Sequence, residues 1–282
     1  MARRSPISRT GGFTIFELAL SLSIMAVLGV GILVPFVAQV SQRKIADTER
    51  ILEQAKEALI GYATATGRLP CPAVGDEDGF EKFASGTPVG SPENGNCRTW
   101  YGFLPAATLG FTPIDELGYA IDGWATPSNR IRYAVSNQPI TVPNSSPAIQ
   151  VTNPFTRENG MRTATMAGMA GVASPFWVVC AGGTGAVLTP SPACGPGVAT
   201  LTRNAPAVIW SSGANAATGG NSIDEAQNPH ANASASVPNG SADRIFVSRT
   251  RTDYSGNEFD DVLSWLSIGN LVSRMVMGGQ LP

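Results

Sequence analysis

The chain of 282 residues has few charged side chains and only one histidine. Charged residues make up 14% of it and apolar residues 43%, and the formal net charge is −2. With so little net positive charge, the chain has no overall field that would attract nucleic acid. Low charge density is ordinary for an exported protein and uncommon for a cytosolic one. The composition therefore favours export and gives no support to general nucleic-acid binding.

The sequence also lacks the common catalytic motifs HExxH, GxSxG and GxxxxGK[ST]. The single histidine, His230, lies in a Ser/Asn/Ala-rich segment, which is a poor setting for a catalytic base. Asp260 and Asp261 are adjacent, so on a helix they would diverge and serve as helix-start charges rather than as an acid/base pair. We predict that the protein is not an enzyme. A membrane-tethered enzyme is the weaker alternative, and it would require a polar pocket with converging titratable groups.

The chain has only four cysteines, and none of them forms a CxxC motif that would suggest a zinc site. Four cysteines in an exported chain favour disulfides, and three pairings are compatible with that number. We favour Cys71–Cys97 and Cys180–Cys194, because each pair closes a local loop rich in glycine and proline. Each bridge would contribute about 3 kcal/mol by restricting the unfolded chain.

A long uncharged stretch covers residues 18–38, and about 20 apolar helical residues are enough to cross a bilayer. Three arginines and no acid lie in the first twelve residues, which favours a cytoplasmic N-terminus. A secretory signal peptide cut near Ala38 is disfavoured, because Phe36 stands where a small residue is needed. An uncleaved membrane anchor is a serious alternative. Neither alternative explains Glu17, an acid at the start of the apolar stretch that is costly deep in a bilayer and calls for a partner.

The segment Gly11-Gly12-Phe13-Thr14-Ile15-Phe16-Glu17 resembles the type IV pilin signature, apart from Phe16, where that family usually has an aliphatic residue. The resemblance implies that prepilin peptidase cuts between Gly12 and Phe13 and methylates the new amino terminus. It also implies that Glu17 pairs with the amino terminus of an adjacent subunit during assembly. No catalytic residue, metal or cofactor is implied.

A second resemblance covers most of the chain and concerns large-headed proteins similar to pseudopilins. It is carried by four short segments: GRLPCPA (67–73), GFLPAATLG (102–110), NRIRYAVS (129–136) and FDDVLSWLS (259–267). Together the resemblances imply a minor pilin or pseudopilin of a type IV pilus or type II secretion system. Its partners would be inner-membrane lipid before assembly and other pilin or pseudopilin subunits afterwards. A tip adhesin or a DNA-uptake minor pilin, with an unspecified surface ligand or DNA as partner, is the alternative.

The implied localisation is a single pass through the inner membrane with the head in the periplasm, followed by the filament. The domains are a leader over 1–12, a transmembrane or filament-core helix over 13–40, an amphipathic half over 41–66 and a head over 67–282. In the amphipathic half, Ile45, Leu52 and Leu59 recur at intervals of seven, and Gly67 provides a helix stop.

The head is predicted to be α+β, with an antiparallel or mixed sheet packed on the long helix. Residues 70–113 read as irregular, and 212–243 as a surface loop. The predicted strands are 130–136, in which Ile131, Tyr133 and Val135 alternate with a solvent face, and 176–181, 207–211 and 244–248. Residues 258–277 have apolar side chains at helical spacing and are predicted to form a helical pair broken at Gly269-Asn270.

An acidic run, GDEDG at 75–79, raises a calcium hypothesis because that ion prefers oxygen ligands. Asp76 and Asp78 would be the ligands. The run is too short for a full calcium loop, so a solvated acidic turn is the favoured interpretation.

Overall fold

The computed structural model describes residues 14–75, 77–171, 176–186, 192–218, 222–228, 245–254 and 256–281. Within the first helix, the side chains of residues 27–38 are outside this description. The predictions for Gly12, Phe13, Asp76 and His230 therefore fall outside the described residues. The chain divides into two compact units, residues 1–43 and 44–282.

The first helix, α1, is continuous over Ile15–Thr66. It ends as the sequence predicts, at Gly67, which has a positive φ of 78° and donates its N–H to the Ala63 carbonyl. Within the residues whose structure is described, no helix combines the length and the apolar character that a membrane span needs.

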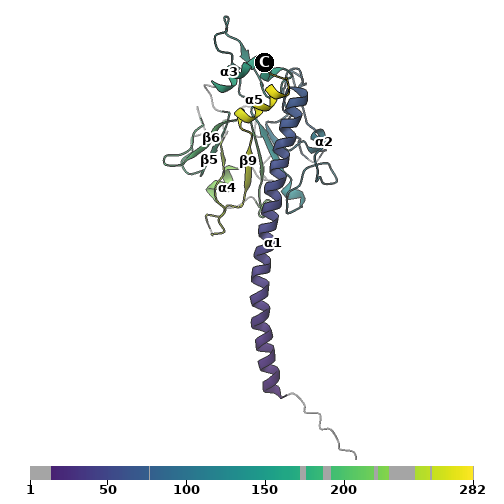
Figure 1. Cartoon of the computed structure of the whole chain (residues 1–282), viewed down its shortest axis with the longest axis vertical. Coiled ribbons are helices and arrows are strands. Elements are labelled where there is room, and N and C mark those ends of the chain that lie inside the picture. The colour runs from purple at the N-terminus through teal and green to yellow at the C-terminus, as the bar shows by residue number, and fades with distance from the viewer. Residues whose placement is uncertain are drawn as a thin grey trace, which may run out of the picture. The chain divides into compact units, whose positions relative to one another are not determined.

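The second unit is α+β, with three small sheets (Figure 1). A four-stranded antiparallel sheet has the order β1-β2-β7-β9, and a three-stranded sheet has the order β6-β5-β8, with β5 and β8 parallel. β3 and β4 form a short hairpin. The strands are β1 (Tyr101–Phe103), β2 (Arg132–Val135), β3 (Ile140–Thr141), β4 (Gln150–Val151), β5 (Trp177–Cys180), β6 (Thr200–Ala205), β7 (Ala207–Ser211), β8 (Ile245–Val247) and β9 (Val262–Trp265). The other helices are α2 (Ala106–Leu109), the 3₁₀ turn η1 (Pro127–Asn129), α3 (Gly160–Ala170), α4 (Ile223–Gln227) and α5 (Ile268–Met277).

The core of this unit has three layers, and the four-stranded sheet is the middle one. One face of that sheet packs against the C-terminal half of α1 and against α5, through a cluster that includes Leu52, Leu59, Tyr133, Ile209 and Leu271. Figure 1 shows this half of α1 beside β9 and α5. The other face packs against the three-stranded sheet, through a cluster that includes Tyr101, Trp177, Val208, Trp210 and Phe246. The apolar stripe predicted for residues 41–66 is thus the surface on which the head is built.

The four predicted strands are confirmed as β2, β5, β7 and β8. The prediction for residues 130–136 was wrong in one respect, because all four residues of β2 are buried. Alternation predicted a solvent face for Arg132 and Ala134. Since the three-stranded sheet covers that face, both side chains are inside the head instead.

The prediction of a helical pair over residues 258–277 is wrong in its first half. Residues 262–265 form β9, which pairs antiparallel with β7 from Val208↔Trp265 to Ser211↔Val262. The following helix, α5, begins after Ser267, so the chain changes direction before Gly269-Asn270 rather than at it. A short apolar run fits either period, and here the open edge of β7 provides backbone partners for a strand.

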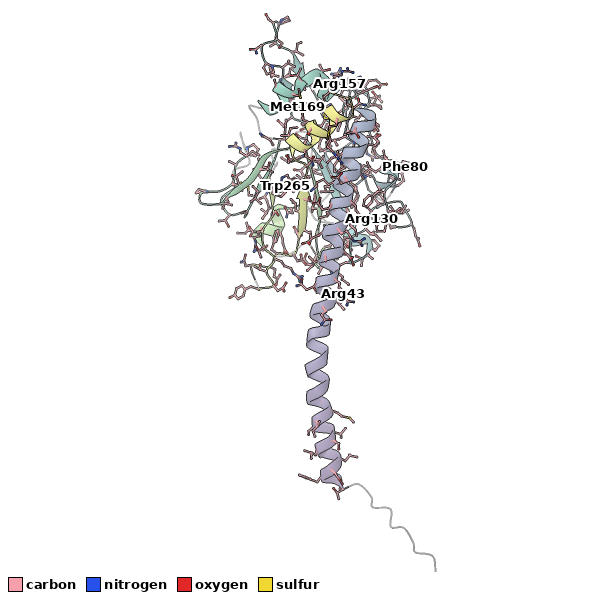
Figure 2. All side chains as sticks on the ribbon, in the orientation of Figure 1. Arg43, Phe80, Arg130, Arg157, Met169 and Trp265 are labelled. Carbon is pink, nitrogen blue, oxygen red and sulfur yellow. A yellow bond between two sulfur atoms is a disulfide. The ribbon has the colours of Figure 1, made fainter. Side chains whose placement is uncertain are left out.

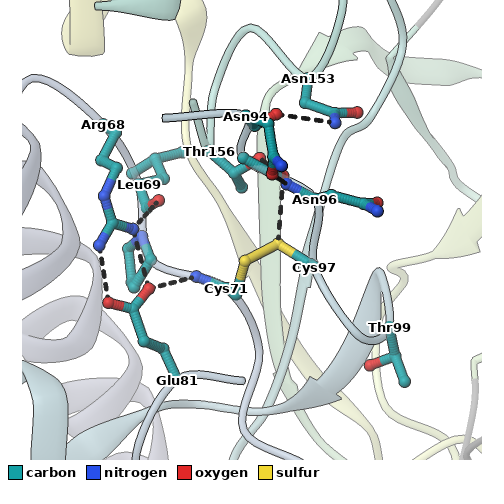
Figure 3. Close-up of a disulfide and its surroundings, with 12 residues drawn as sticks. Arg68, Leu69, Cys71, Glu81, Asn94, Asn96, Cys97, Thr99, Asn153 and Thr156 are labelled. Carbon is teal, nitrogen blue, oxygen red and sulfur yellow. Dashed lines mark hydrogen bonds and ion pairs between the residues drawn. A yellow bond between two sulfur atoms is a disulfide. The ribbon is translucent and has the colours of Figure 1, made fainter. Parts of the chain in front are cut away.

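Both favoured disulfides are present, Cys71–Cys97 and Cys180–Cys194. Beside the first, two long side chains form a buried ion pair (Figure 3). The Arg68 guanidinium donates to both carboxylate oxygens of Glu81, at 2.7 and 2.8 Å. Glu81 also accepts from the Cys71 backbone N–H at 3.1 Å and from the Tyr62 hydroxyl at 3.2 Å. One carboxylate thus joins the end of α1, the segment that follows it and the disulfide.

Burial of Tyr62 and the nearby Glu81 charge raise the pKa of the Tyr62 hydroxyl to about 12. Burial opposes the charge of Arg68, but the hydrogen bonds and attraction of Glu81 outweigh that effect and raise the pKa of the guanidinium. Arg68 therefore stays charged, and Tyr62 neutral, at neutral pH.

Gly123 lies in close contact with the backbone of α1. Its N–H donates to the Thr48 hydroxyl at 3.0 Å, and a Cβ at this position would lie 2.3 Å from the Lys44 carbonyl oxygen. We expect Gly123→Ala to lower the free energy of unfolding by about 1–3 kcal/mol, since backbone would have to move. Gly61→Ala is the control: a Cβ there has no neighbour within 4 Å, and alanine in a helix interior should add about 0.5–1 kcal/mol. Urea unfolding of both variants compares them, and equal effects would contradict the close approach.

Candidate functional site

The start of α1 holds the one predicted assembly residue that the structure describes, Glu17. Its carboxylate Oε2 accepts from the Thr14 backbone N–H at 3.4 Å and from the Thr14 hydroxyl at 3.3 Å. The Glu17 N–H donates in return to the Thr14 hydroxyl at 3.2 Å. This reciprocal arrangement is a capping box, and its T-x-x-E spacing is visible in the sequence. Glu17 thus has a local partner in the single chain, which sequence reasoning missed.

The first turns of α1 expose an unusual amount of apolar surface. Ile15 is 90% exposed and Met25 is 70% exposed. The same stretch has five more large exposed apolar side chains: Phe16, Leu18, Leu20, Leu22 and Ile24. Figure 2 shows side chains pointing away from this part of the helix on both sides of the ribbon. Glu17 is the only charged residue between positions 14 and 26. An apolar surface of this extent marks a contact with lipid or with other protein.

The polar side chains in this stretch are satisfied by the helix itself. The Ser21 hydroxyl donates to the Glu17 carbonyl at 2.8 Å, and the Ser23 hydroxyl donates to the Ala19 carbonyl at 2.9 Å. Serine hydroxyls bonded to the carbonyl four residues earlier need no water. This segment can therefore leave water without stranding a hydroxyl group.

A second cluster joins three carboxylates from separate parts of the head: Glu225 of α4, and Asp260 and Asp261 before β9. One oxygen of each lies within 4.8 Å of the others. Glu225 is 2% exposed; its carboxylate accepts from the Asp260 N–H at 2.9 Å and from the Asn215 side chain at 3.2 Å. Asp260 accepts from the Ala214 N–H at 2.7 Å.

Raised pKa values explain how three carboxyl groups can lie so close together, because a protonated carboxyl group does not repel its neighbours. Burial raises the pKa of Glu225, Asp260 and Asp261, and the pKa of Asp261 rises well above its usual range. Asp261 accepts one hydrogen bond, at 2.8 Å, from the side-chain amide of the buried Asn228. Calcium takes about six to eight oxygen ligands, and three carboxylates supply only part of such a set. The three carboxyl groups are therefore better suited to sharing protons with one another than to holding a calcium ion.

The sequence prediction for Asp260 and Asp261 was wrong. They are not helix-start charges, because the helix begins at Ile268. They converge with Glu225 although they are adjacent, and neither of them lies in a helix. The partner acid lies in the segment 212–243, read as a featureless surface loop, where α4 instead begins with a capping hydroxyl from Ser222.

We expect Asp261→Asn to make stability less sensitive to pH. A carboxyl whose pKa is raised by folding stays protonated in the native state while the unfolded chain loses its proton. The native protein then binds more protons, so the free energy of unfolding falls as pH rises from about 4 towards the raised pKa. The amide cannot ionise and should remove most of Asp261's share of this fall. Urea unfolding at pH 4.5 and pH 7 measures it.

Asp253→Asn is the matched control, because Asp253 has an exposed side chain paired with Arg251. It should leave the pH dependence unchanged. A wild-type protein whose stability rises over this pH range would contradict the assignment.

The calcium candidates have other partners where the structure describes them. Asp78 lies 2.9 Å from the Lys82 ammonium and also accepts from the Phe80 N–H at 3.1 Å. Glu77 lies 2.8 Å from the Arg98 guanidinium. These cations reduce the charge that would attract a metal ion. Asp76 lies outside the described residues.

No protein-family model, curated protein or solved structure matches this chain significantly.

Proposed function

We propose that the protein is a minor pilin or pseudopilin, a structural subunit of a type IV pilus or type II secretion pseudopilus. The observation that carries the proposal is the exposed apolar surface at the start of α1, interrupted only by the charge of Glu17. Such a surface needs lipid or protein around it: the inner membrane supplies lipid before assembly, and a filament core of packed helices supplies protein afterwards. The head, built on the other half of α1, is then free to face outward.

In this proposal the first twelve residues are removed by prepilin peptidase between Gly12 and Phe13, and the new amino terminus is methylated. The helix from Phe13 onward anchors the chain in the inner membrane with its head in the periplasm. Inner-membrane lipid surrounds it before assembly, and pilin or pseudopilin helices surround it afterwards. The internally bonded hydroxyls of Ser21 and Ser23 fit this dry setting.

Glu17 has a distinct role in the proposal. In the single chain it caps its own helix through Thr14. During assembly the same carboxylate pairs with the amino terminus of a neighbouring subunit. A charge with a partner of opposite sign costs far less in an apolar setting than an unpaired one, so pairing selects a defined position of each new subunit along its neighbour.

Photo-crosslinking in cells tests this placement. A photoreactive residue in place of Leu22, which is 59% exposed, should form adducts with other filament subunits, identified by mass spectrometry. The same residue in place of Gln54, on the polar face of α1, is the control and should not enter the filament core. If position 22 gives no subunit adducts in cells that are making filaments, the proposed assembly surface is wrong.

A further inference from the structure

Arg132 is the one charged residue among those paired on the inner face of the four-stranded sheet, where it packs against the second sheet. Its direct cross-strand neighbours are Phe103 of β1 and Trp210 of β7. The other paired residues on this face are apolar or aromatic: Tyr101, Ala134, Val208, Leu263 and Trp265. Burying a single cation in an apolar layer is costly unless the cation has a partner.

Arg132 is also exceptional among the buried arginines of the described structure. Arg68, Arg130 and Arg132 are each at most 7% exposed. Arg68 is paired with Glu81, and the guanidinium of Arg130 lies 2.7 Å from the Asp115 carboxylate. Within the described part of the chain, the guanidinium of Arg132 has no hydrogen bond or ion pair. It lies instead over the ring of Phe103, with its carbon 4.8 Å from the ring centre.

The guanidinium of Arg132 is buried but keeps some contact with solvent. In the described part of the head, three side-chain polar atoms are shut off from solvent and have no hydrogen bond: Trp177 Nε1, Asp260 Oδ1 and Arg249 Nε, the last of which is ion-paired with Asp224. The unbonded nitrogens of Arg132 are not among them, so each reaches some solvent. A ligand group could reach these nitrogens from outside, whereas no side chain from the described residues does.

We propose that Arg132 is the centre of an anion site on the head, which takes an oxyanion group, either a carboxylate or a phosphate. A guanidinium presents a planar fork of donors that matches such groups with two parallel hydrogen bonds. Phe103 holds the fork in place from one side. Arg130, two residues away on the same face of the strand, adds a second cation 5.8 Å from the same ring centre. The site does not depend on the filament role.

Burial lowers the pKa of Arg132 to about 10, so the guanidinium is charged at neutral pH. Arg130 is the lesser contributor, because Asp115 already balances its charge. The ligand therefore contacts Arg132 first.

Anion titration of the full chain in neutral detergent tests the site, with sodium phosphate and sodium acetate as separate probes against sodium chloride at equal ionic strength. We expect wild-type protein to bind at least one probe about ten- to a hundredfold more tightly than Arg132→Gln, the usual gain from a charge-assisted hydrogen bond. Arg132→Lys keeps the charge without the fork and should fall between them. Arg162→Gln, at an exposed helix position, is the control and should bind like wild type.

Nuclear magnetic resonance of the Arg132 Nε–H in the wild-type protein keeps the test decisive if a variant fails to fold. A saturable shift of that signal with acetate assigns a carboxylate, and one with phosphate assigns a phosphate; either supports the site. A signal that neither anion moves, or equal binding by wild type and Arg132→Gln, overturns it.

Discussion

Replacing Glu17 with Gln should reduce incorporation of the chain into filaments by more than about tenfold while leaving its insertion in the membrane intact. The amide keeps the size and shape of the side chain but cannot pair as a charge with a neighbour's amino terminus. Truncating one partner of a buried charge pair leaves the other unpaired and commonly costs about 2–5 kcal/mol. Immunoblots of sheared filament and membrane fractions measure the ratio.

Thr14→Ala separates this role from helix capping. That change removes the hydroxyl that accepts from the Glu17 N–H and donates to its carboxylate, but it keeps the charge. Loss of a cap costs about 1 kcal/mol, so incorporation should fall only modestly. If Thr14→Ala and Glu17→Gln reduce incorporation equally, Glu17 acts as a helix cap and does not pair with the amino terminus of a neighbouring subunit.

Replacing Glu81 with Gln should strongly destabilise the head. It leaves the Arg68 guanidinium, whose side chain is 8% exposed, buried without its counter-charge. Breaking a buried pair by removing one partner costs about 3–5 kcal/mol. The Cys71 N–H and the Tyr62 hydroxyl would also lose a charged acceptor. Urea unfolding of the purified chain should show a clearly lower midpoint.

Glu53→Gln is the matched control for this prediction. Glu53 pairs with Lys56 at 2.6 Å one turn away on the same helix, and its side chain is 61% exposed. An exposed pair of this kind contributes about 0.5 kcal/mol or less. A Glu81→Gln protein no less stable than Glu53→Gln would show that the ion pair beside the disulfide does not hold the end of α1 to the head.

Local patterns in the sequence predicted much of this fold. The seven-residue spacing of Ile45, Leu52 and Leu59 predicted the helix face under the head, where Leu52 and Leu59 are part of the core. The glycine- and proline-rich loops predicted both disulfides. Strands β2, β5, β7 and β8 were each predictable from runs of β-branched and aromatic residues. Each of these features depends on residues that are close together in the sequence.

The wrong predictions concern residues whose structure depends on contacts between segments far apart in the sequence. Arg132 was expected to face solvent because alternation cannot show that a second sheet covers the other face of β2. Residues 262–265 were read as helix because only pairing with β7 makes them a strand. The carboxylate cluster needed α4 and the start of β9 to be brought together, and no spacing within either segment indicates that. At the start of α1, the sequence carries both the assembly signature and the T-x-x-E spacing of a capping box, and only the first entered the prediction.

In the proposed function, the chain is processed at its N-terminus and then assembled through α1. The most direct measurement is the mass of the N-terminal peptide of the mature protein, isolated from cells that produce it. We expect a peptide that begins at Phe13 and carries one added methyl group on its amino terminus. A mature chain that still begins at Met1, or one that begins near Gln39, would contradict it.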